Sequence, residues 1–134
     1  MTLYVDSSAL AKRYVAESDS DAAEAILLAD TRWVTAGHTY VEVTLALARR
    51  LHEDDVPRAQ EAFERDWQRI LVVGLDDVVC RRAAAIGVVI GTRTLDALHL
   101  AAAERSVGRA GPLVTFDVRL AQVARSMGFS VLGA

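Results

Sequence analysis

Two apolar segments of this sequence each lead into an aspartate and then into a segment with the character of a helix. Residues 3–5 precede Asp6, and residues 113–115 precede Asp117. Short apolar runs of this kind are typical of buried strands, and the carboxyl ends of parallel strands form the edge at which α/β sheets bind ligands. The sequence therefore predicts that two carboxylates from distant parts of the chain meet at one edge of a sheet.

The rest of the sequence alternates short apolar runs with longer amphipathic segments, a pattern typical of βαβ units. The predicted strands lie near residues 3–5, 33–35, 70–73, 113–115 and 131–132. Helices are expected to begin at residues 7–8, 18–21 and 55–57, and to cover residues 39–51, 76–89, 94–107 and 118–127. Residues 39–51 also alternate as a strand would, but their length and a capping box from Thr39 to Glu42 favour a helix. The predicted fold class is α/β, with a mostly parallel central sheet flanked by helices.

Length, composition and charge narrow the class of protein. With 134 residues, of which 52% are hydrophobic, residues 1–134 are expected to form one domain. The single cysteine, Cys80, cannot form an internal disulfide, which favours a reducing compartment and hence the cytoplasm. No segment approaches the ~18 consecutive apolar residues of a membrane span, so no membrane association is expected. A formal net charge of -3 argues against non-specific nucleic-acid binding through a broad positive field.

Two further acids, Glu42 and Asp96, lie in predicted helices and are candidates to join Asp6 and Asp117. All four have an ordinary explanation, because acids at helix starts cap the helix or interact favourably with its dipole. If the four converge, however, their mutual repulsion requires a counter-ion. Helix N-termini supply about half a positive charge each at most, so one divalent cation would balance the remainder. Mg²⁺ or Mn²⁺, which prefer oxygen ligands, suits this set, whereas zinc would require histidine or cysteine.

A divalent cation held by carboxylates activates water and stabilises charge on a phosphodiester. The four acids therefore predict nuclease chemistry that needs no covalent nucleophile. Three hydroxyl residues near them in the sequence are expected to hydrogen-bond the ligating carboxylates or metal-bound water, although each also suits a helix cap. These residues are Ser7, Thr94 and Thr115.

Together these segments resemble the PIN-domain ribonucleases, and more closely the VapC toxins of VapBC toxin–antitoxin pairs. The resemblance covers nearly the whole sequence and rests on the order and spacing of its segments. They are residues 5–10 (VDSSAL) with Tyr14 and Glu17 downstream, Glu42 early in a helix, residues 94–103 (TLDALHLAAA) and residues 113–120 (LVTFDVRL). Residues 83–90 depart from the pattern, because they are more apolar than expected before the third acid.

The resemblance implies a PIN-like three-layer fold and a Mg²⁺-dependent endoribonuclease toxin of a type II toxin–antitoxin pair, which hydrolyses RNA and thereby inhibits translation. It assigns the acidic quartet of Asp6, Glu42, Asp96 and Asp117 to binding Mg²⁺ or Mn²⁺ and to catalysis, with Thr115 as a neighbour. Glu42 is expected either to hold the metal or to position the attacking water. The resemblance further implies an RNA substrate, a homodimer and inhibition by a small VapB-like antitoxin.

The histidines carry less information than the acids. His99 follows Asp96 by about one helical turn, so the two side chains lie on one face of the predicted helix and could form a mixed metal-ligand pair. Because the resemblance assigns the metal to acids alone, a buried His99, or one that supports a ligand, is favoured. His38 and His52 show no pattern.

Basic residues close in sequence to the acids are candidates to hold the RNA backbone. A solvated helix face is the alternative for each of them. The candidates are Lys12, Arg13, Arg49, Arg93 and Arg119. Phe63 and Trp67, four residues apart in a predicted helix, suit core or interface packing better than base stacking.

Two other functions remain open from the sequence. A PIN-like protein without catalysis, in which the acids only cap helices, would act as a protein-binding module. A phosphoaspartyl hydrolase also uses a strand-end aspartate with Mg²⁺, but it needs a second acid where this sequence has Ser8, and a late lysine that is absent. A thermal shift with Mn²⁺ separates the metal-binding enzyme from the binding module.

Overall fold

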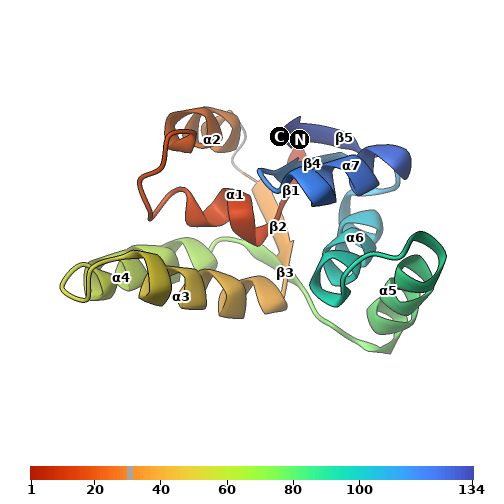
Figure 1. The fold of residues 1–134 in the computed structure, drawn as a ribbon, viewed down its shortest axis with the longest axis horizontal. Helices are drawn as coiled ribbons and strands as arrows, with labels where there is room; N and C mark the ends of the chain where they lie inside the picture. The colour runs from red at the N-terminus through yellow and green to blue at the C-terminus, as the bar shows by residue number, and fades with distance from the viewer. Residues whose placement is uncertain (30–31) are drawn as a thin grey trace.

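The fold is built on a five-stranded sheet in which all neighbouring strands are parallel (Figure 1). The structure is a computed structural model that describes residues 1–29 and 32–134. The strand order is β3-β2-β1-β4-β5. The strands are β1 (Thr2–Val5), β2 (Arg32–Ala36), β3 (Leu71–Val73), β4 (Pro112–Thr115) and β5 (Ser130–Gly133). The predicted parallel α/β fold is confirmed, and each predicted strand lies within one residue of the observed bounds.

Helices cover both faces of the sheet and complete three layers. Within the described residues they are α1 (Ser7–Ala11), α2 (Ser20–Leu28), α3 (His38–Arg50), α4 (Val56–Trp67), α5 (Asp77–Ile90), α6 (Thr94–Val107) and α7 (Val118–Ser126). In Figure 1, α1 to α4 lie on one side of the sheet and α5 to α7 on the other. The segment that also alternates like a strand, residues 39–51, forms helix α3.

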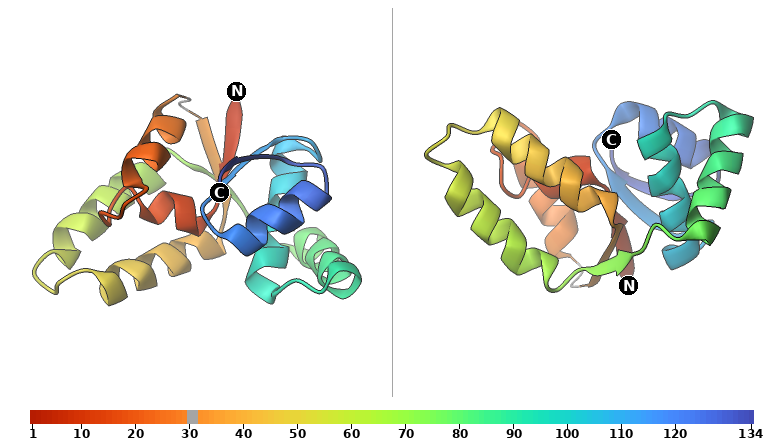
Figure 2. Two further views of the ribbon diagram at one scale, coloured as in Figure 1. Left: turned by 45° about the horizontal axis from the view of Figure 1, so that its top comes forward. Right: turned by 90° about the horizontal axis from the view of Figure 1, so that it is seen from below.

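The order of the strands creates a switch point in the middle of the sheet. The chain passes from β1 to β2 and β3 on one side, then crosses to β4 and β5 on the other side of β1. Because right-handed crossovers in the two directions put their helices on opposite faces, the two groups of helices diverge from the sheet, as Figure 2 shows. Ligand crevices form at the carboxyl ends of strands at such a point. Asp6 follows β1 and Asp117 follows β4 there.

The core divides between the two faces of the sheet because side chains alternate along each strand. Leu3 and Val5 of β1 pack towards α1, α3 and α4, whereas Tyr4 packs towards α5, α6 and α7. Phe63 has no exposed surface and contacts the ring of Trp67, with centroids 5.7 Å apart. Phe63 therefore belongs to the core, and Trp67 is partly buried against it.

The helix starts show which capping predictions hold. Asp6 caps α1 by accepting a hydrogen bond from the Ala9 backbone N–H at 2.9 Å, and Asp117 caps α7. The capping box from Thr39 to Glu42 is wrong, because α3 begins at His38 after Gly37 and has no side-chain cap. The Thr39 hydroxyl instead forms a 2.7 Å hydrogen bond with Thr35 of β2.

The apolar segment 83–90 forms the second half of α5. Val88 and Val89 are 85% and 83% exposed, and α5 ends at Gly91, which has a positive φ of 81°. No single helix in residues 1–29 and 32–134 is long and apolar enough to cross a membrane. The pair α5 and α6 meets that test together on length and composition only, and it is bent by 120°.

Candidate active site

Asp6 is the most buried of the four acids, with 2% of its surface exposed. Its carboxylate accepts hydrogen bonds from the hydroxyl groups of Ser8, at 2.8 Å, and Thr115, at 2.6 Å, as well as from the Ala9 N–H. All of these donors are neutral. Among residues 1–29 and 32–134, no basic side chain forms an ion pair with this buried carboxylate. Asp6 is thus a carboxyl group held in a fixed orientation without a charge of opposite sign in contact with it.

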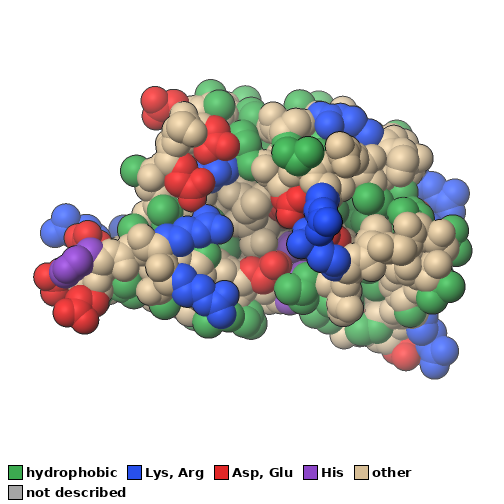
Figure 3. Space-filling model, in the orientation of Figure 1, with side chains coloured by type: hydrophobic (Ala, Val, Ile, Leu, Met, Phe, Trp, Pro, Cys, Tyr) green, Lys and Arg blue, Asp and Glu red, His purple; other side chains and the backbone are tan. Residues whose placement is uncertain are grey.

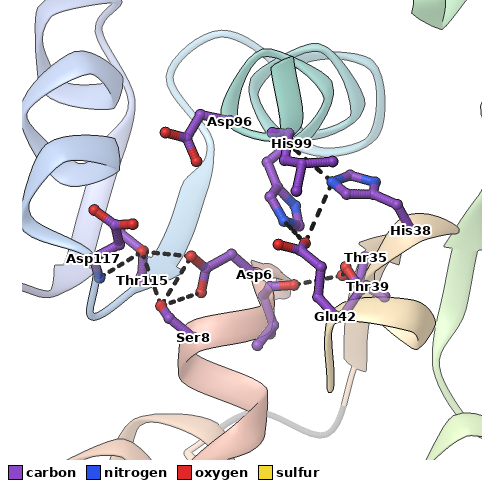
Figure 4. Close-up of polar contacts among 12 residues, drawn as sticks. Asp6, Ser8, Thr35, His38, Thr39, Glu42, Asp96, His99, Thr115 and Asp117 are labelled. Carbon is purple, nitrogen blue, oxygen red and sulfur yellow. Dashed lines mark hydrogen bonds and ion pairs between the residues drawn. The ribbon is translucent and has the colours of Figure 1, made fainter. Parts of the chain in front are cut away.

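Asp96 and Asp117 face the same space as Asp6 from α6 and from the start of α7 (Figure 4). One guanidinium nitrogen of Arg93 lies 3.0 Å from Asp96 Oδ2 and 3.3 Å from Asp117 Oδ2. Thr115 links Asp117 to Asp6, because its hydroxyl donates to Asp6 and accepts a hydrogen bond from the Asp117 N–H at 3.1 Å. We refer to Asp6, Asp96 and Asp117 as the carboxylate centre.

Glu42 borders this space on its other side but contacts two histidines (Figure 4). Its Oε1 atom lies 2.8 Å from His99 Nε2 and 3.6 Å from His38 Nε2. The other ring nitrogen of His99 forms a 2.7 Å hydrogen bond with the hydroxyl of Tyr4. His38 is 9% exposed and His99 is 2% exposed, so both rings lie inside the fold. We refer to His38, Glu42 and His99 as the histidine centre.

The pKa values of the carboxylates in the two centres are shifted in opposite directions. Burial raises the pKa of Asp6, although His99 and the hydrogen bonds from Thr115, Ala9 and Ser8 oppose the rise. Burial also acts to raise the pKa of Glu42, but the hydrogen bond and charge of His99 outweigh it and lower that pKa. Burial together with the charge of His99 lowers the pKa of His38 to about 4. A buried carboxylate with a raised pKa is stabilised by a cation, whereas Glu42 already has partners that favour its charged form.

The spacing of ligand atoms also separates the two centres. Within residues 1–29 and 32–134, His38, Glu42 and His99 are the one group of at least three metal-binding side chains whose ligand atoms all lie within 4.8 Å of one another. The three aspartates are spaced more widely than this. Wider spacing between oxygen donors suits Mg²⁺, which keeps several of its water ligands when a protein binds it. The residues of the carboxylate centre therefore fit a hydrated, oxygen-binding divalent cation.

Two cavities open beside the acids. One, of about 360 Å³, is lined by residues that include Ser7, Glu42, Leu45, Arg49, Arg50 and Asp117. The other, of about 300 Å³, is lined by residues that include Thr92, Arg93, Asp96 and Arg119. In Figure 3, acidic side chains occupy the hollowed middle of this face and basic side chains flank them on both sides. An acidic floor with basic flanks is an arrangement that can hold a metal together with a polyanion.

The five basic candidates fall into two groups. Lys12 forms ion pairs with Glu17, at 2.8 Å, and Asp19, at 2.6 Å. Arg13 is paired with Glu24 and Asp66, so acids of the same fold neutralise both of these side chains. Arg49, Arg93 and Arg119 instead line the two cavities. For Arg49 and Arg119, no acidic partner is present among residues 1–29 and 32–134.

The three predicted hydroxyl residues differ in their contacts with the acids. Thr115 hydrogen-bonds Asp6, and Ser7 lines the same cavity as Glu42 and acts to lower the pKa of Glu42. Thr94 lines another cavity, between α5 and α6, and among the described residues its hydroxyl forms no hydrogen bond with the four acids. Ser8 was not among the predicted partners of Asp6, although its position two residues after Asp6 at a helix start is a signal for it. His38, which lies one helical turn before Glu42 on α3, was not predicted as a site residue either.

Comparison with known proteins identifies the class to which this fold and site belong. A family model described as the PIN domain matches residues 3–126. The chain therefore belongs to the PIN-domain family.

The relatives are more specific than the family. The chain is 32% identical over 132 residues to Ribonuclease VapC46 of Mycobacterium tuberculosis, which covers 97% of this chain and 95% of that protein. The crystal structure of VapC20 from Mycobacterium tuberculosis, described as a toxin that cleaves the sarcin–ricin loop, has a TM-score of 0.77 at 18% identity and covers 98% of this chain and 99% of VapC20. VapBC-5, a toxin–antitoxin system from the same organism, has a TM-score of 0.67 at 19% identity, covering 99% of this chain and 98% of that one. The predicted resemblance to VapC proteins is confirmed.

Proposed function

We propose that this protein is a Mg²⁺-dependent endoribonuclease and the toxin of a type II toxin–antitoxin pair. The observation that carries the proposal is the buried Asp6 carboxylate, which has only neutral donors and faces Asp96 and Asp117 at the switch point of the sheet. The identity to Ribonuclease VapC46 supports the same activity. Residues 1–134 are taken as a single PIN-like domain, because all five strands belong to one sheet.

The carboxylate centre would hold the metal, which is Mg²⁺ with Mn²⁺ as a substitute. When bound, such a cation supplies Lewis-acid stabilisation of the charge that develops on the phosphodiester. Ser8 and Thr115 fix the orientation of the Asp6 carboxylate before any ligand arrives. Arg93 bridges Asp96 and Asp117 at the position of a cation, so its guanidinium would release at least one of these oxygens when a metal binds.

Glu42 is proposed to position the attacking water and accept its proton. It lines the larger cavity, and Oε1 is held by His99 at 2.8 Å. The hydrogen bond from His99 lowers the pKa of Glu42 against the effect of burial, so the carboxylate stays charged near neutral pH. A charged carboxylate in a fixed orientation is suited to orient water rather than to form a covalent bond.

The substitution Asp96→Asn tests the proposal. It keeps the size of the side chain but removes a charge from the carboxylate centre, so Mg²⁺-dependent cleavage of RNA is expected to fall by about 100-fold or more. The matched control is Asp54→Asn, which changes an acid that is 84% exposed and lies after α3. Cleavage is measured with purified protein in a buffer of defined metal content. Full activity in Asp96→Asn would overturn the proposed metal centre.

RNA is proposed to bind across the two cavities, with Arg49 and Arg119 contacting phosphates. A guanidinium without an internal acid is available for bidentate contact with a phosphate oxygen pair. Replacing Arg49 by Ala is expected to weaken binding and to reduce the salt dependence by about one counter-ion. Replacing Arg81 by Ala, on the exposed part of α5, is the control. An unchanged salt slope in the Arg49 variant would remove this residue from the RNA site.

The biological setting follows from the relatives. We propose a VapB-like antitoxin as the partner, since VapBC-5 is a toxin–antitoxin system of the same fold. We further propose action in the cytoplasm, where RNA cleavage would inhibit translation, and assembly as a homodimer. The exposed valines at the end of α5 give an apolar surface that a second copy would cover. Light scattering of the purified protein tests the dimer directly.

A further inference from the structure

The two histidines of the histidine centre differ in how completely their ring nitrogens are hydrogen-bonded. His99 uses both ring nitrogens, one with Glu42 and one with Tyr4, as expected of a buried structural histidine. His38 is different, because its Nε2 approaches Leu95 O at 3.2 Å and Glu42 at 3.6 Å, while its buried Nδ1 has no hydrogen-bond partner among the described residues. A polar ring is therefore buried beside Glu42 at a cost that its own hydrogen bonds do not offset.

The spacing of the three side chains matches a metal site. Two ligands bound to one zinc ion at about 2.0 Å in a tetrahedral site lie about 3.3 Å apart. The two separations to Glu42 Oε1, 2.8 Å from His99 and 3.6 Å from His38, lie on either side of that value. Small shifts of side chains would thus bring the three ligand atoms around one ion. Figure 4 shows the two rings converging on the carboxylate from α3 and α6.

We propose that His38, Glu42 and His99 form a second metal site, selective for a borderline transition ion such as Zn²⁺. Two imidazoles and one carboxylate are the donor set of open zinc sites, whereas the carboxylate centre offers oxygen alone. Tyr4 supports this assignment, because its hydroxyl oxygen can accept the Nδ1–H of His99 when Nε2 binds a metal, so only the tautomer of the ring changes. The fourth position would be filled by water.

Glu42 belongs both to the proposed zinc site and to the proposed catalytic site, so zinc binding would affect the proposed activity. A zinc ion that holds Glu42 against the histidines would keep this carboxylate from orienting water in the larger cavity. Zinc would then inhibit RNA cleavage while Mg²⁺ remained bound to the aspartates. This consequence depends on the proposed function, but zinc binding itself does not.

Titration calorimetry of the metal-free full-length chain with ZnCl₂ tests the site without RNA. The chain is expected to bind one Zn²⁺ tightly. His38→Gln should weaken binding at least tenfold, since loss of even a group that supports a ligand costs about 10–100-fold in affinity. Visible absorption of the Co²⁺ form gives a second readout, because nitrogen-containing four-coordinate sites differ in spectrum from sites with six oxygens.

Two controls separate this site from other histidines and from the carboxylate centre. His52→Gln changes a histidine that is 68% exposed, and Asp96→Asn alters the carboxylate centre; both should bind zinc as the unmodified chain does. Glu42→Gln provides a second ligand variant of nearly unchanged shape, and circular dichroism checks the fold of each. Equal zinc affinity in the His38 and Glu42 variants, or loss of zinc in Asp96→Asn, would overturn the histidine site. Neither result would bear on whether Mg²⁺ supports cleavage.

Discussion

The carboxylate centre and the histidine centre lie side by side at one edge of the same sheet, yet they satisfy their charges differently. Asp6 is buried among neutral donors, and the only cation that forms ion pairs with Asp96 and Asp117 in the described residues is the exposed Arg93. Glu42, in contrast, is bound by a buried histidine that is itself held by Tyr4. The first region is incomplete without a cation, whereas the second is already ordered by hydrogen bonds.

This difference suits the two centres of one crevice to two different tasks. An anion without a partner attracts a cation, and an anion in a fixed network supplies orientation. The two kinds of donor also select different ions, because oxygen ligands favour Mg²⁺ and imidazole nitrogen favours zinc. Substitutions on the two sides should therefore change metal binding, pH dependence and stability in distinguishable ways.

The largest effect is expected for Asp6→Asn. Because burial raises the pKa of Asp6, the charged carboxylate is less favourable in the metal-free fold than in the unfolded chain. The contribution of Asp6 to stability is full below its unfolded pKa of 3.8 and is lost as pH rises through its raised folded pKa. At neutral pH the variant without metal should melt at a higher temperature than the unmodified chain, because it no longer buries a charge, and it should lose the stabilisation that Mn²⁺ gives the unmodified chain.

Differential scanning calorimetry in EDTA and in MnCl₂ measures both parts of this prediction. Asp54→Asn serves again as the control and should keep the Mn²⁺ shift. A lower melting temperature for Asp6→Asn in EDTA would show that Asp6 stabilises the metal-free fold. The contrast between the two centres would then be lost.

An intermediate effect is expected for His38→Gln on the acid side of neutrality. The pKa of His38 is lowered to about 4, from 6.5, by burial and by His99. Its contribution to stability is thus present above pH 6.5 and is lost as pH falls towards about 4. Between pH 7.5 and pH 6 the unmodified chain should lose about 1 kcal/mol more stability than the variant. Urea unfolding in EDTA measures this difference, with His52→Gln as the control; equal losses in all three proteins would contradict it.

The smallest effect is expected for Arg93→Gln. The guanidinium competes with a metal for Asp96 and Asp117, but it is largely exposed and therefore screened by water and salt. Removing it should tighten Mn²⁺ binding about threefold at low ionic strength, with a smaller gain at high salt. Mn²⁺ titration followed by electron paramagnetic resonance measures free ion directly. Weaker binding would instead show that Arg93 holds the two aspartates in position for the metal.

The order of the elements and the location of the acids were predictable because they follow from local patterns. Strand-end aspartates and alternating periodicity are sufficient to predict a parallel sheet with Asp6 and Asp117 at one edge, and the capping of α1 and α7 agrees with them. The predicted capping box failed for a reason that is not local. Thr39 hydrogen-bonds Thr35 of the preceding strand, and Glu42 turns towards His99, a residue 57 positions away.

The histidine centre is the part that the sequence did not reveal. His38 and Glu42 are one turn apart on α3, but that spacing gains meaning only when α6 packs against the same end of β1 and β2. The basic residues present the same difficulty. Nothing in their spacing separates Lys12, which is paired with Glu17 and Asp19, from Arg49 at the larger cavity. Such distinctions depend on contacts between elements that are distant in sequence.

The position of β4 between β1 and β5 also determines when, during synthesis, the carboxylate centre can assemble. The fourth strand to emerge from the ribosome is the one that inserts beside the first, and Asp117 lies two residues after its end. A nascent chain that ends before residue 112 has only three of the five strands and lacks one of the three aspartates of the carboxylate centre. On the proposed function, the nascent polypeptide cannot cleave RNA until the fourth strand and Asp117 have been synthesised.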